Sequence, residues 1–311
     1  MIGAKLLKKI DFTPLTPESK ALYESYLFRE EGRGCEFSFA NLYCWGKQSL
    51  AVLHGHIALF SQFGQRFLYL YPLGSGDKKE ILHAILTDAE ARGIPCCLSG
   101  LTEEAKQTLE RLYPQKFEFQ QNEGSFDYVY SIEDLATLQG KKYHGKRNHL
   151  NRFCEAFPAY TVTPLYEENL VLAKEMAEKW YKARLAEDPK ADFSMEEEAL
   201  WRAFREYRAL GMEGLLLQNG EETLAFTMGS RLSPDTFDVH FKKARPDIQG
   251  AYTAINFEFA RYIQHKYPDV RYLDREEDMG LFGLRRAKQS YHPHHMTKKY
   301  RALLRETSYE D

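Results

Sequence analysis

Acid–base side chains alternate with apolar ones in the segment TFDVHFK, residues 236–242. A two-residue period is typical of a half-buried strand, with the apolar residues on one face and Asp238, His240 and Lys242 on the other. A carboxylate beside an imidazole can take the proton from an attacking amine or hydroxyl, so we predict that Asp238 or His240 is a general base. The alternative is an ordinary polar strand face.

The same strand leads into a loop, residues 245–249, and then into a helix that we expect to start at Gly250. The backbone N–H groups and the positive end of the helix dipole make such a start attractive to phosphate or carboxylate. The candidate residues for binding a donor's anionic group here are Lys242, Gln249, Gly250, Ala251 and Tyr252. Glycine near a helix start is common, so a loop that binds nothing is the alternative.

Acidic side chains follow the next predicted strand, residues 270–274. Ligand groups in α/β sheets usually lie just beyond strand ends, and Glu276, Glu277 and Asp278 would suit the α-amine of an aminoacyl group or a basic acceptor. They could equally cap the helix that follows. Asn256 lies on the apolar stripe of the Gly250 helix, where a buried amide needs partners, either a substrate or a neighbouring backbone.

Cations and a tyrosine come next along the chain. Arg285, Arg286 and Lys288 could neutralise a donor phosphate or complement the C-terminal end of their helix. Tyr291 could donate a proton to a leaving group, or it could simply pack. The histidines at 292, 294 and 295 do not have the spacing of a known ligand set, so we predict no metal site.

A basic segment, KKYHGKRNHLNR, covers residues 141–152 and contains no acid. Such a segment can hold the phosphates of a nucleic acid or a cofactor, and it can also be a solvated helix between two domains. The residues predicted to contact nucleic acid are Lys141, Lys142, Lys146, Arg147 and Arg152.

These residues require a layered α/β framework to position them. In the first half we expect helices at 17–29, 78–92 and 103–113, with strands at 49–62, 66–71, 95–98, 117–119 and 128–130. The second half should contain a strand at 160–164, helices at 167–184 and within 192–210, and strands at 214–218, 223–231 and 236–242. A strand at 270–274, a helix at 281–287 and a strand at 298–303 complete it. We predict two domains, residues 1–135 and 136–311.

Composition sets further limits. The 311 residues carry a net charge of −3, with 43% hydrophobic and 28% charged residues, as in a soluble globular protein. No window approaches the apolar length of a transmembrane segment, and the first twelve residues contain too short an apolar run for a signal peptide. Five cysteines without a CxxC pair fit reduced thiols, so we expect a cytoplasmic protein.

The order of elements in the second half, β, α, α, three strands, α, β, α, β, resembles the GNAT acyltransferase fold. In that family the loop after the fourth strand holds the pyrophosphate of the acyl donor through its backbone amides. The familiar loop pattern is Gln/Arg-x-x-Gly-x-Gly/Ala. Here Asp247 stands three residues before Gly250, and Tyr252 stands at the second Gly/Ala position.

A broader resemblance covers most of the chain. LQGKKYHGKRNHLNRF at 138–153, HFKKARPDIQGAYTAINFEFA at 240–260 and LDREEDMGLFGLRRAKQSYHP at 273–293 resemble the phosphatidylglycerol lysyltransferase C-terminal-domain family. The resemblance implies two tandem GNAT-like domains, each a mixed sheet flanked by helices. Characterised lysyltransferases of this family move an aminoacyl group from aminoacyl-tRNA to a lipid head group.

The sequence therefore predicts an acyltransferase or aminoacyltransferase. The expected donor is aminoacyl-tRNA or acyl-CoA, and the acceptor is an amine or hydroxyl of a small molecule, a peptide or a lipid head group. Two alternatives remain: an acyl-CoA-dependent N-acyltransferase, and a non-catalytic GNAT-fold binding protein that has lost its donor site. The departures at Asp247 and Tyr252 would suit the second alternative.

Overall fold

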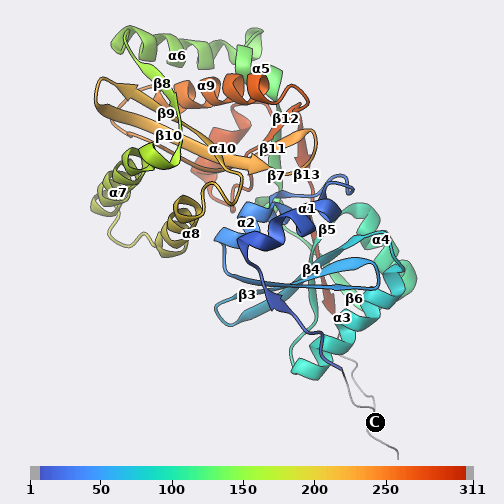
Figure 1. Ribbon diagram of the computed structural model, residues 1–311. Coiled ribbons are helices and arrows are strands. Elements are labelled where there is room, and N and C mark those ends of the chain that lie inside the picture. The colour runs from blue at the N-terminus through green and yellow to red at the C-terminus, as the bar shows by residue number, and fades with distance from the viewer. Residues whose placement is uncertain (1–7, 306–311) are drawn as a thin grey trace, which may run out of the picture. The chain divides into compact units, whose positions relative to one another are not determined.

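The computed structural model describes residues 8–305 (Figure 1). The described residues form two compact units, 8–126 with 297–305 (unit 1) and 127–296 (unit 2), and each is built on a seven-stranded mixed sheet flanked by helices. Residues 1–7, part of the stretch considered for a signal peptide, lie outside the described range. No described helix has the length and hydropathy needed to cross a membrane.

Unit 1 has the strand order β1-β2-β3-β4-β5-β14-β6, antiparallel except for the β4–β5 pair. Its elements are β1 Thr13–Pro14, η1 Pro17–Ser19, α1 Lys20–Leu27, η2 Cys35–Phe37, α2 Phe39–Cys44, β2 Lys47–Leu53, β3 His56–Phe63, β4 Arg66–Gly74, α3 Lys78–Arg92, β5 Cys97–Leu101, α4 Glu103–Leu112, β6 Phe117–Gln121, η3 Glu123–Ser125 and β14 Tyr300–Leu304. Apolar residues from α3, α4 and the central strands form its core. The predicted helices at 78–92 and 103–113 are confirmed.

One prediction in unit 1 is wrong: residues 49–62 are not a single strand. The chain turns at His54 and Gly55, both with positive φ, and β2 pairs with β3 as a hairpin. A two-residue turn of this kind usually carries Asn-Gly or Asp-Gly. His-Gly lacks that signal, so the sequence alone does not predict this turn.

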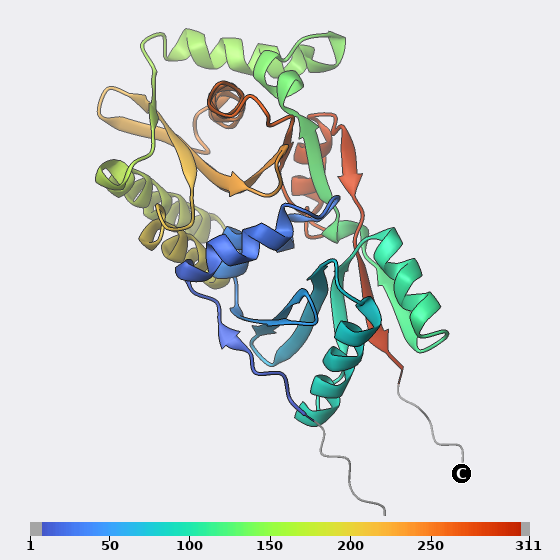
Figure 2. The same cartoon turned by 45° about the vertical axis from the view of Figure 1, so that its right-hand side comes forward.

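Unit 2 has the strand order β13-β7-β12-β11-β10-β9-β8. Its elements are β7 Asp127–Ser131, α5 Ile132–Thr137, η4 Lys141–Tyr143, α6 His144–Ala156, β8 Thr161–Pro164, η5 Glu167–Asn169, α7 Leu170–Glu187, α8 Ser194–Arg205, β9 Glu213–Asn219, β10 Glu222–Arg231, β11 Thr236–Ala244, α9 Ala251–Lys266, β12 Tyr272–Asp274, α10 Phe282–Gln289 and β13 His295–Thr297. Helices α5, α6 and α9 lie on one side of this sheet, and α7 and α8 lie on the other, as Figures 1 and 2 show. The predicted meander of β9, β10 and β11 is confirmed.

Strand pairing crosses the boundary predicted at residues 135/136. β7 pairs with β12 in the sheet of unit 2, whereas β14, close to the C-terminus, pairs with β5 and β6 in the sheet of unit 1. These long-range pairings depend on partners that periodicity does not reveal. The boundary itself stays a prediction.

β11 is buried on both faces, which corrects the expectation of a half-buried strand. Both α7 and α9 pack on it, and Asp238 is fully buried. Its alternation is also broken, because Met228 pairs with Phe241 but Ser230 pairs with Asp238. Val239 and His240 therefore lie opposite the single residue Gly229, which is a β-bulge.

The bulge changes which side chains share a face. Phe237 packs against Phe259 of α9, and Lys242, five residues later, donates a hydrogen bond to Asn256 of the same helix. Strict alternation would place residues 237 and 242 on opposite faces. The prediction that Asp238, His240 and Lys242 all lie on one face is therefore wrong at Lys242.

Gly229 leaves room for this bulge, and its replacement should destabilise unit 2. A Cβ at residue 229 would lie 2.0 Å from the Asp238 carbonyl oxygen, so we expect Gly229→Ala to lower the free energy of unfolding by about 1–3 kcal/mol. Gly145→Ala is the control, because nothing lies within 4 Å of a Cβ there and alanine favours the α6 helix. Denaturant unfolding measures both, and equal effects would contradict this role of Gly229.

Candidate functional site

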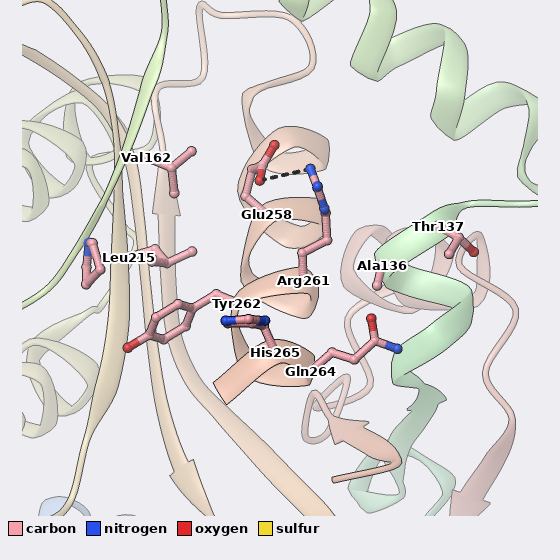
Figure 3. Close-up of a pocket in the computed structure, with 10 residues that line it drawn as sticks. Ala136, Thr137, Val162, Leu215, Glu258, Arg261, Tyr262, Gln264 and His265 are labelled. Carbon is pink, nitrogen blue, oxygen red and sulfur yellow. Dashed lines mark ion pairs between the residues drawn. The ribbon is translucent and has the colours of Figure 1, made fainter. Parts of the chain in front are cut away.

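A pocket of about 610 Å³ opens in unit 2 between α5, β8, β9 and α9 (Figure 3). Glu258 and Arg261 form an ion pair of 3.7 Å on its α9 wall, and Tyr160 donates a hydrogen bond of 2.8 Å to Glu258. None of the residues predicted for the site lines this pocket. The predicted site residues of unit 2 therefore lie outside this pocket.

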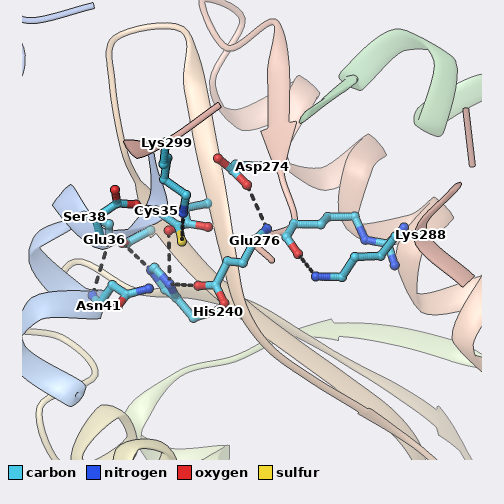
Figure 4. A network of polar contacts seen from close by, with 12 residues as sticks. Cys35, Glu36, Ser38, Asn41, His240, Asp274, Glu276, Lys288 and Lys299 are labelled. Carbon is cyan, nitrogen blue, oxygen red and sulfur yellow. Dashed lines mark hydrogen bonds and ion pairs between the residues drawn. The ribbon is translucent and has the colours of Figure 1, made fainter. Parts of the chain in front are cut away.

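His240 lies at the centre of a hydrogen-bonded group (Figure 4). Its Nδ1 is 3.1 Å from Glu276 Oε1 and 3.4 Å from Asp238 Oδ2, and its Nε2 is 2.8 Å from Ser230 Oγ. Carboxylates at Nδ1 favour the tautomer that carries its proton there, so that Nε2 accepts the hydrogen bond from Ser230. We call Ser230, Asp238, His240 and Glu276 the His240 centre. It has the geometry of a general base held by carboxylates.

The backbone at Glu276 is in an uncommon conformation that aims its side chain at His240. Glu276 has φ of 58°, and its N–H donates to Asp274 Oδ1 at 2.7 Å while its carbonyl accepts from Tyr128 N–H at 3.2 Å. A non-glycine residue in the left-handed region persists only where its surroundings hold it there. The acidic side chain is thus fixed toward the imidazole.

Sequence reasoning missed Ser230. It lies on β10 and pairs with Asp238 across the hairpin. The two strands were predicted, and aligning them through the Ser233-Pro234 turn would have placed residue 230 near Asp238. What the sequence does not reveal is the bulge that follows this pair.

The His240 centre also has the donor types of a cation site. One ligand atom each from Asp238, His240 and Glu276 lies within 4.8 Å of the others. Two carboxylate oxygens and an imidazole nitrogen suit a divalent ion such as Zn²⁺ or Mn²⁺. The sequence had suggested no metal, and this set is where one would bind.

A second group of residues, the cation cluster, consists of Lys146, Lys242, Arg275 and Lys288. Lys242 Nζ donates a 2.8 Å hydrogen bond to Asn256 Oδ1, and Asn256 Nδ2 donates to the Tyr291 hydroxyl at 3.1 Å. Lys146 Nζ lies 3.8 Å from the centroid of the Tyr291 ring, and the Arg275 guanidinium lies 4.8 Å from it. Several predicted residues from distant parts of the chain therefore meet around Tyr291.

The charges of the cation cluster repel one another. Burial, together with Arg275, Lys288 and Lys146, holds the pKa of Lys242 well below its ordinary value. Burial and then Arg275 lower the pKa of Lys146 to about 8. Within residues 8–305, no group accepts a hydrogen bond from the buried Nη1 of Arg275. An anion bound there would relieve the repulsion and supply the missing acceptor.

The same two segments of the chain supply both groups. β11 supplies His240 to one and Lys242 to the other, about 7 Å apart along the strand. The chain after β12 supplies Glu276 and Arg275, which are consecutive. β11 and β12 are paired parallel neighbours. Neighbouring residues of two paired segments thus supply both groups, with His240 and Lys242 on opposite faces of β11.

Other predicted residues have structural partners. Burial alone would raise the pKa of Asp278, but hydrogen bonds from Arg285, Tyr128 and the Gly280 N–H lower it to about 2. Lys288 donates to the backbone carbonyls of Arg275 and Glu277. Asp278, Arg285 and Lys288 thus anchor α10, while Arg286 is exposed.

The loop before α9 packs against α6. Gly250 has φ of 88°, and a Cβ on it would lie 2.4 Å from the His149 carbonyl oxygen. The Ala251 N–H donates to Ile248, and the Tyr252 hydroxyl accepts from Trp180. Gln249 is exposed. Close helix packing explains the glycine without a ligand, and donor binding at this loop stays a prediction.

The basic segment is divided in the structure. Lys146 joins the cation cluster, Lys142 pairs with Asp134 at 2.8 Å, and Arg147 donates to the carbonyls of Leu138 and Gly140. Lys141 and Arg152 are exposed. Contact of this segment with nucleic acid stays a prediction.

The lowered pKa of Lys146 predicts a pH-dependent stability. Between pH 8 and 10.5 Lys146 is protonated in the unfolded chain but has lost its proton in the folded protein. Below pH 8 the buried charge therefore lowers the free energy of unfolding by its full amount, and this loss becomes smaller as the pH rises. Lys146→Met should remove that trend. Its stability relative to the wild type should fall by about 1 kcal/mol between pH 8 and 10.5, allowing for screening by solvent. Urea unfolding of Lys146→Met and of Lys141→Met measures it, and a similar trend in the exposed Lys141 control would contradict the assignment.

Comparisons with known proteins agree on a family and a fold. A conserved protein of unknown function from Bacteroides thetaiotaomicron is 34% identical, covers 95% of this chain and 100% of its own, and superposes with a TM-score of 0.90. L-PGS from Bacillus licheniformis is 18% identical over 96% of both chains, with a TM-score of 0.69. A tandem GNAT protein from clavulanic acid biosynthesis is 8% identical over 96% of this chain and 99% of its own, with a TM-score of 0.51.

A curated relative is more distant. An uncharacterized protein of Mycoplasmoides gallisepticum is 25% identical over 182 residues, which is 58% of this chain and 56% of that protein, so the match spans about half of the relative. The family model described as "Phosphatidylglycerol lysyltransferase, C-terminal" matches residues 29–303. The chain has a GNAT-like fold and belongs to the phosphatidylglycerol lysyltransferase C-terminal family.

Proposed function

We propose that this protein transfers an aminoacyl group from aminoacyl-tRNA to an amine or hydroxyl acceptor. Its family is named for a lysyltransferase, and L-PGS shares the fold. The observation that carries the proposal is that near neighbours on β11 and consecutive residues after β12 supply both the His240 centre and the cation cluster. Aminoacyl transfer needs a base for the acceptor and a site for the donor's phosphates, and these two groups have that chemistry.

His240 Nε2 is the proton acceptor in this proposal. The acceptor's N–H or O–H gives its proton through the Ser230 hydroxyl to Nε2, while Asp238 and Glu276 stabilise the imidazolium. The acceptor's nitrogen or oxygen forms a bond to the aminoacyl carbonyl carbon. The ester bond to the terminal ribose of the tRNA then breaks.

The cation cluster holds the donor and assists its departure. Lys146, Lys242 and Arg275 bind a phosphate near the 3′ end of the tRNA, which supplies the charge that the cluster lacks. The Tyr291 hydroxyl donates a proton to the leaving ribose oxygen. Asn256 holds that hydroxyl at 3.1 Å, so it is already oriented.

An acyl-CoA donor is the principal alternative. Its pyrophosphate would be expected at the N-terminus of α9. There Gly250 packs against α6, and the Ala251 N–H is already bonded to Ile248. This arrangement favours the tRNA donor over the CoA donor.

The transfer reaction can be tested with the purified protein and total tRNA charged with radiolabelled amino acids. Label should move to one of three offered acceptor classes: phosphatidylglycerol vesicles, a peptide mixture or small amines. His240→Gln should lower the rate by about 10²–10⁴-fold through loss of the general base, and Lys242→Met should raise the KM for charged tRNA. His83→Gln, an exposed histidine on α3, is the matched control.

Three results would count against the proposal. Transfer that requires acetyl-CoA in place of charged tRNA would make the protein an acyl-CoA-dependent enzyme. Equal rates for His240→Gln and His83→Gln would remove His240 as the base. Binding of charged tRNA without any turnover would support a non-catalytic binding protein.

A further inference from the structure

The chain before and within α10 exposes its apolar side chains. Phe282 is 79% exposed, Met279 74%, Leu281 58% and Leu284 36%. Across residues 8–305, the three most exposed large apolar side chains all belong to this stretch. We call residues 279–284 the apolar tip. Such a dense exposed patch usually marks an interaction surface.

The apolar tip is held in place by polar contacts. Arg285 forms a 2.7 Å ion pair with Asp278, and the Leu281 N–H donates to the Asp278 carbonyl at 2.9 Å. The Tyr130 hydroxyl donates to the Lys288 carbonyl, and Lys288 is the buried residue of α10. A surface helix normally buries its apolar side chains, whereas α10 is anchored through its charged ones.

Cations accompany the tip. α10 carries Arg285, Arg286 and Lys288 and no acidic residue. The C-terminal end of α10 also adjoins the basic segment, because Lys146 Nζ donates to Ser290 Oγ at 2.6 Å and His292 Nε2 lies 3.1 Å from the Lys142 carbonyl. Apolar residues at one end of a short helix and cations at the other suit a surface with an apolar interior and an anionic rim.

We propose that the apolar tip inserts into the surface of an anionic lipid bilayer, with the exposed Arg286 and the half-buried Arg285 at the level of the lipid phosphates. A protein partner fits less well, because a stable interface takes about 20–30 residues from each side, whereas the tip is a run of six. A few protruding Met, Leu and Phe side chains beside cations are enough for peripheral attachment to lipid. This inference stands apart from the transfer reaction, because it requires neither donor nor acceptor.

Vesicle sedimentation of the full chain tests the attachment. The protein should sediment with vesicles of phosphatidylcholine mixed with phosphatidylglycerol, less with phosphatidylcholine alone, and less at high salt. The double variant Leu281→Ser, Phe282→Ser should lower the partition coefficient by about tenfold. The matched control is Val171→Ser, Met195→Ser, which removes exposed apolar side chains from α7 and α8.

The readouts separate attachment from other roles of the tip. Both double variants should keep the wild-type melting temperature, since all four side chains are exposed, and both should transfer label to small amines at the wild-type rate if transfer occurs. No binding to mixed vesicles, or equal binding by both double variants, would overturn the proposal. Light scattering that shows a dimer lost only in Leu281→Ser, Phe282→Ser would also overturn it and assign the tip to self-association.

Discussion

The β-bulge of β11 opposite Gly229 is the feature on which the candidate site depends. One extra residue in a strand transfers every later side chain to the other face. Here the transfer takes Lys242 to the α9 side, where Asn256 accepts its hydrogen bond. His240 forms hydrogen bonds with Ser230 and Glu276 and lies 3.4 Å from Asp238. The same strand thereby supplies a base and a cation within two residues. Gly229 makes this possible because no larger residue fits beside the Asp238 carbonyl.

The cation cluster lowers the stability of the fold, and contacts with neighbouring side chains offset part of that loss. Burying an ammonium group costs free energy unless it is neutralised or hydrogen-bonded. Asn256 bonds to Lys242, and the face of the Tyr291 ring attracts Lys146 and Arg275. These contacts compensate in part, as the lowered pKa values of Lys242 and Lys146 show. A stability cost of this kind is expected where a site is organised for an anionic ligand.

The sequence predicted the framework better than the site. Hydrophobic periodicity and turn residues were sufficient for α3, α4 and the meander of β9 to β11, because those signals are local. The strand pairings of β7 and β14 cannot be predicted from local sequence patterns, because they join residues far apart in the chain. The His-Gly turn was missed because it lacks the usual asparagine or aspartate.

The residue types in the sequence indicated which side chains could belong to the site, but not which of them would be in contact. Asp238, His240 and Glu276 were singled out, and the structure brings them together. Asn256 and Tyr291 were singled out separately and meet through one hydrogen bond. For Asp278 and Arg285 the sequence leaves a ligand role and a role at the helix ends open, and in the structure they bind each other. Ser230 follows from aligning β10 and β11 through their turn, which residue types alone do not suggest, and nothing in the sequence links Arg275 to the Tyr291 ring.

The proposed function depends most directly on the binding of a phosphate by the cation cluster. NMR titration of the protein with isotope-labelled lysine, in the absence and presence of AMP, tests it most directly, with Lys242→Met to assign the signal. We expect the pKa of Lys242 to lie well below its ordinary range and AMP to raise it, because a bound phosphate stabilises the ammonium form. A Lys242 that titrates near its ordinary value, or whose titration AMP leaves unchanged, would contradict it.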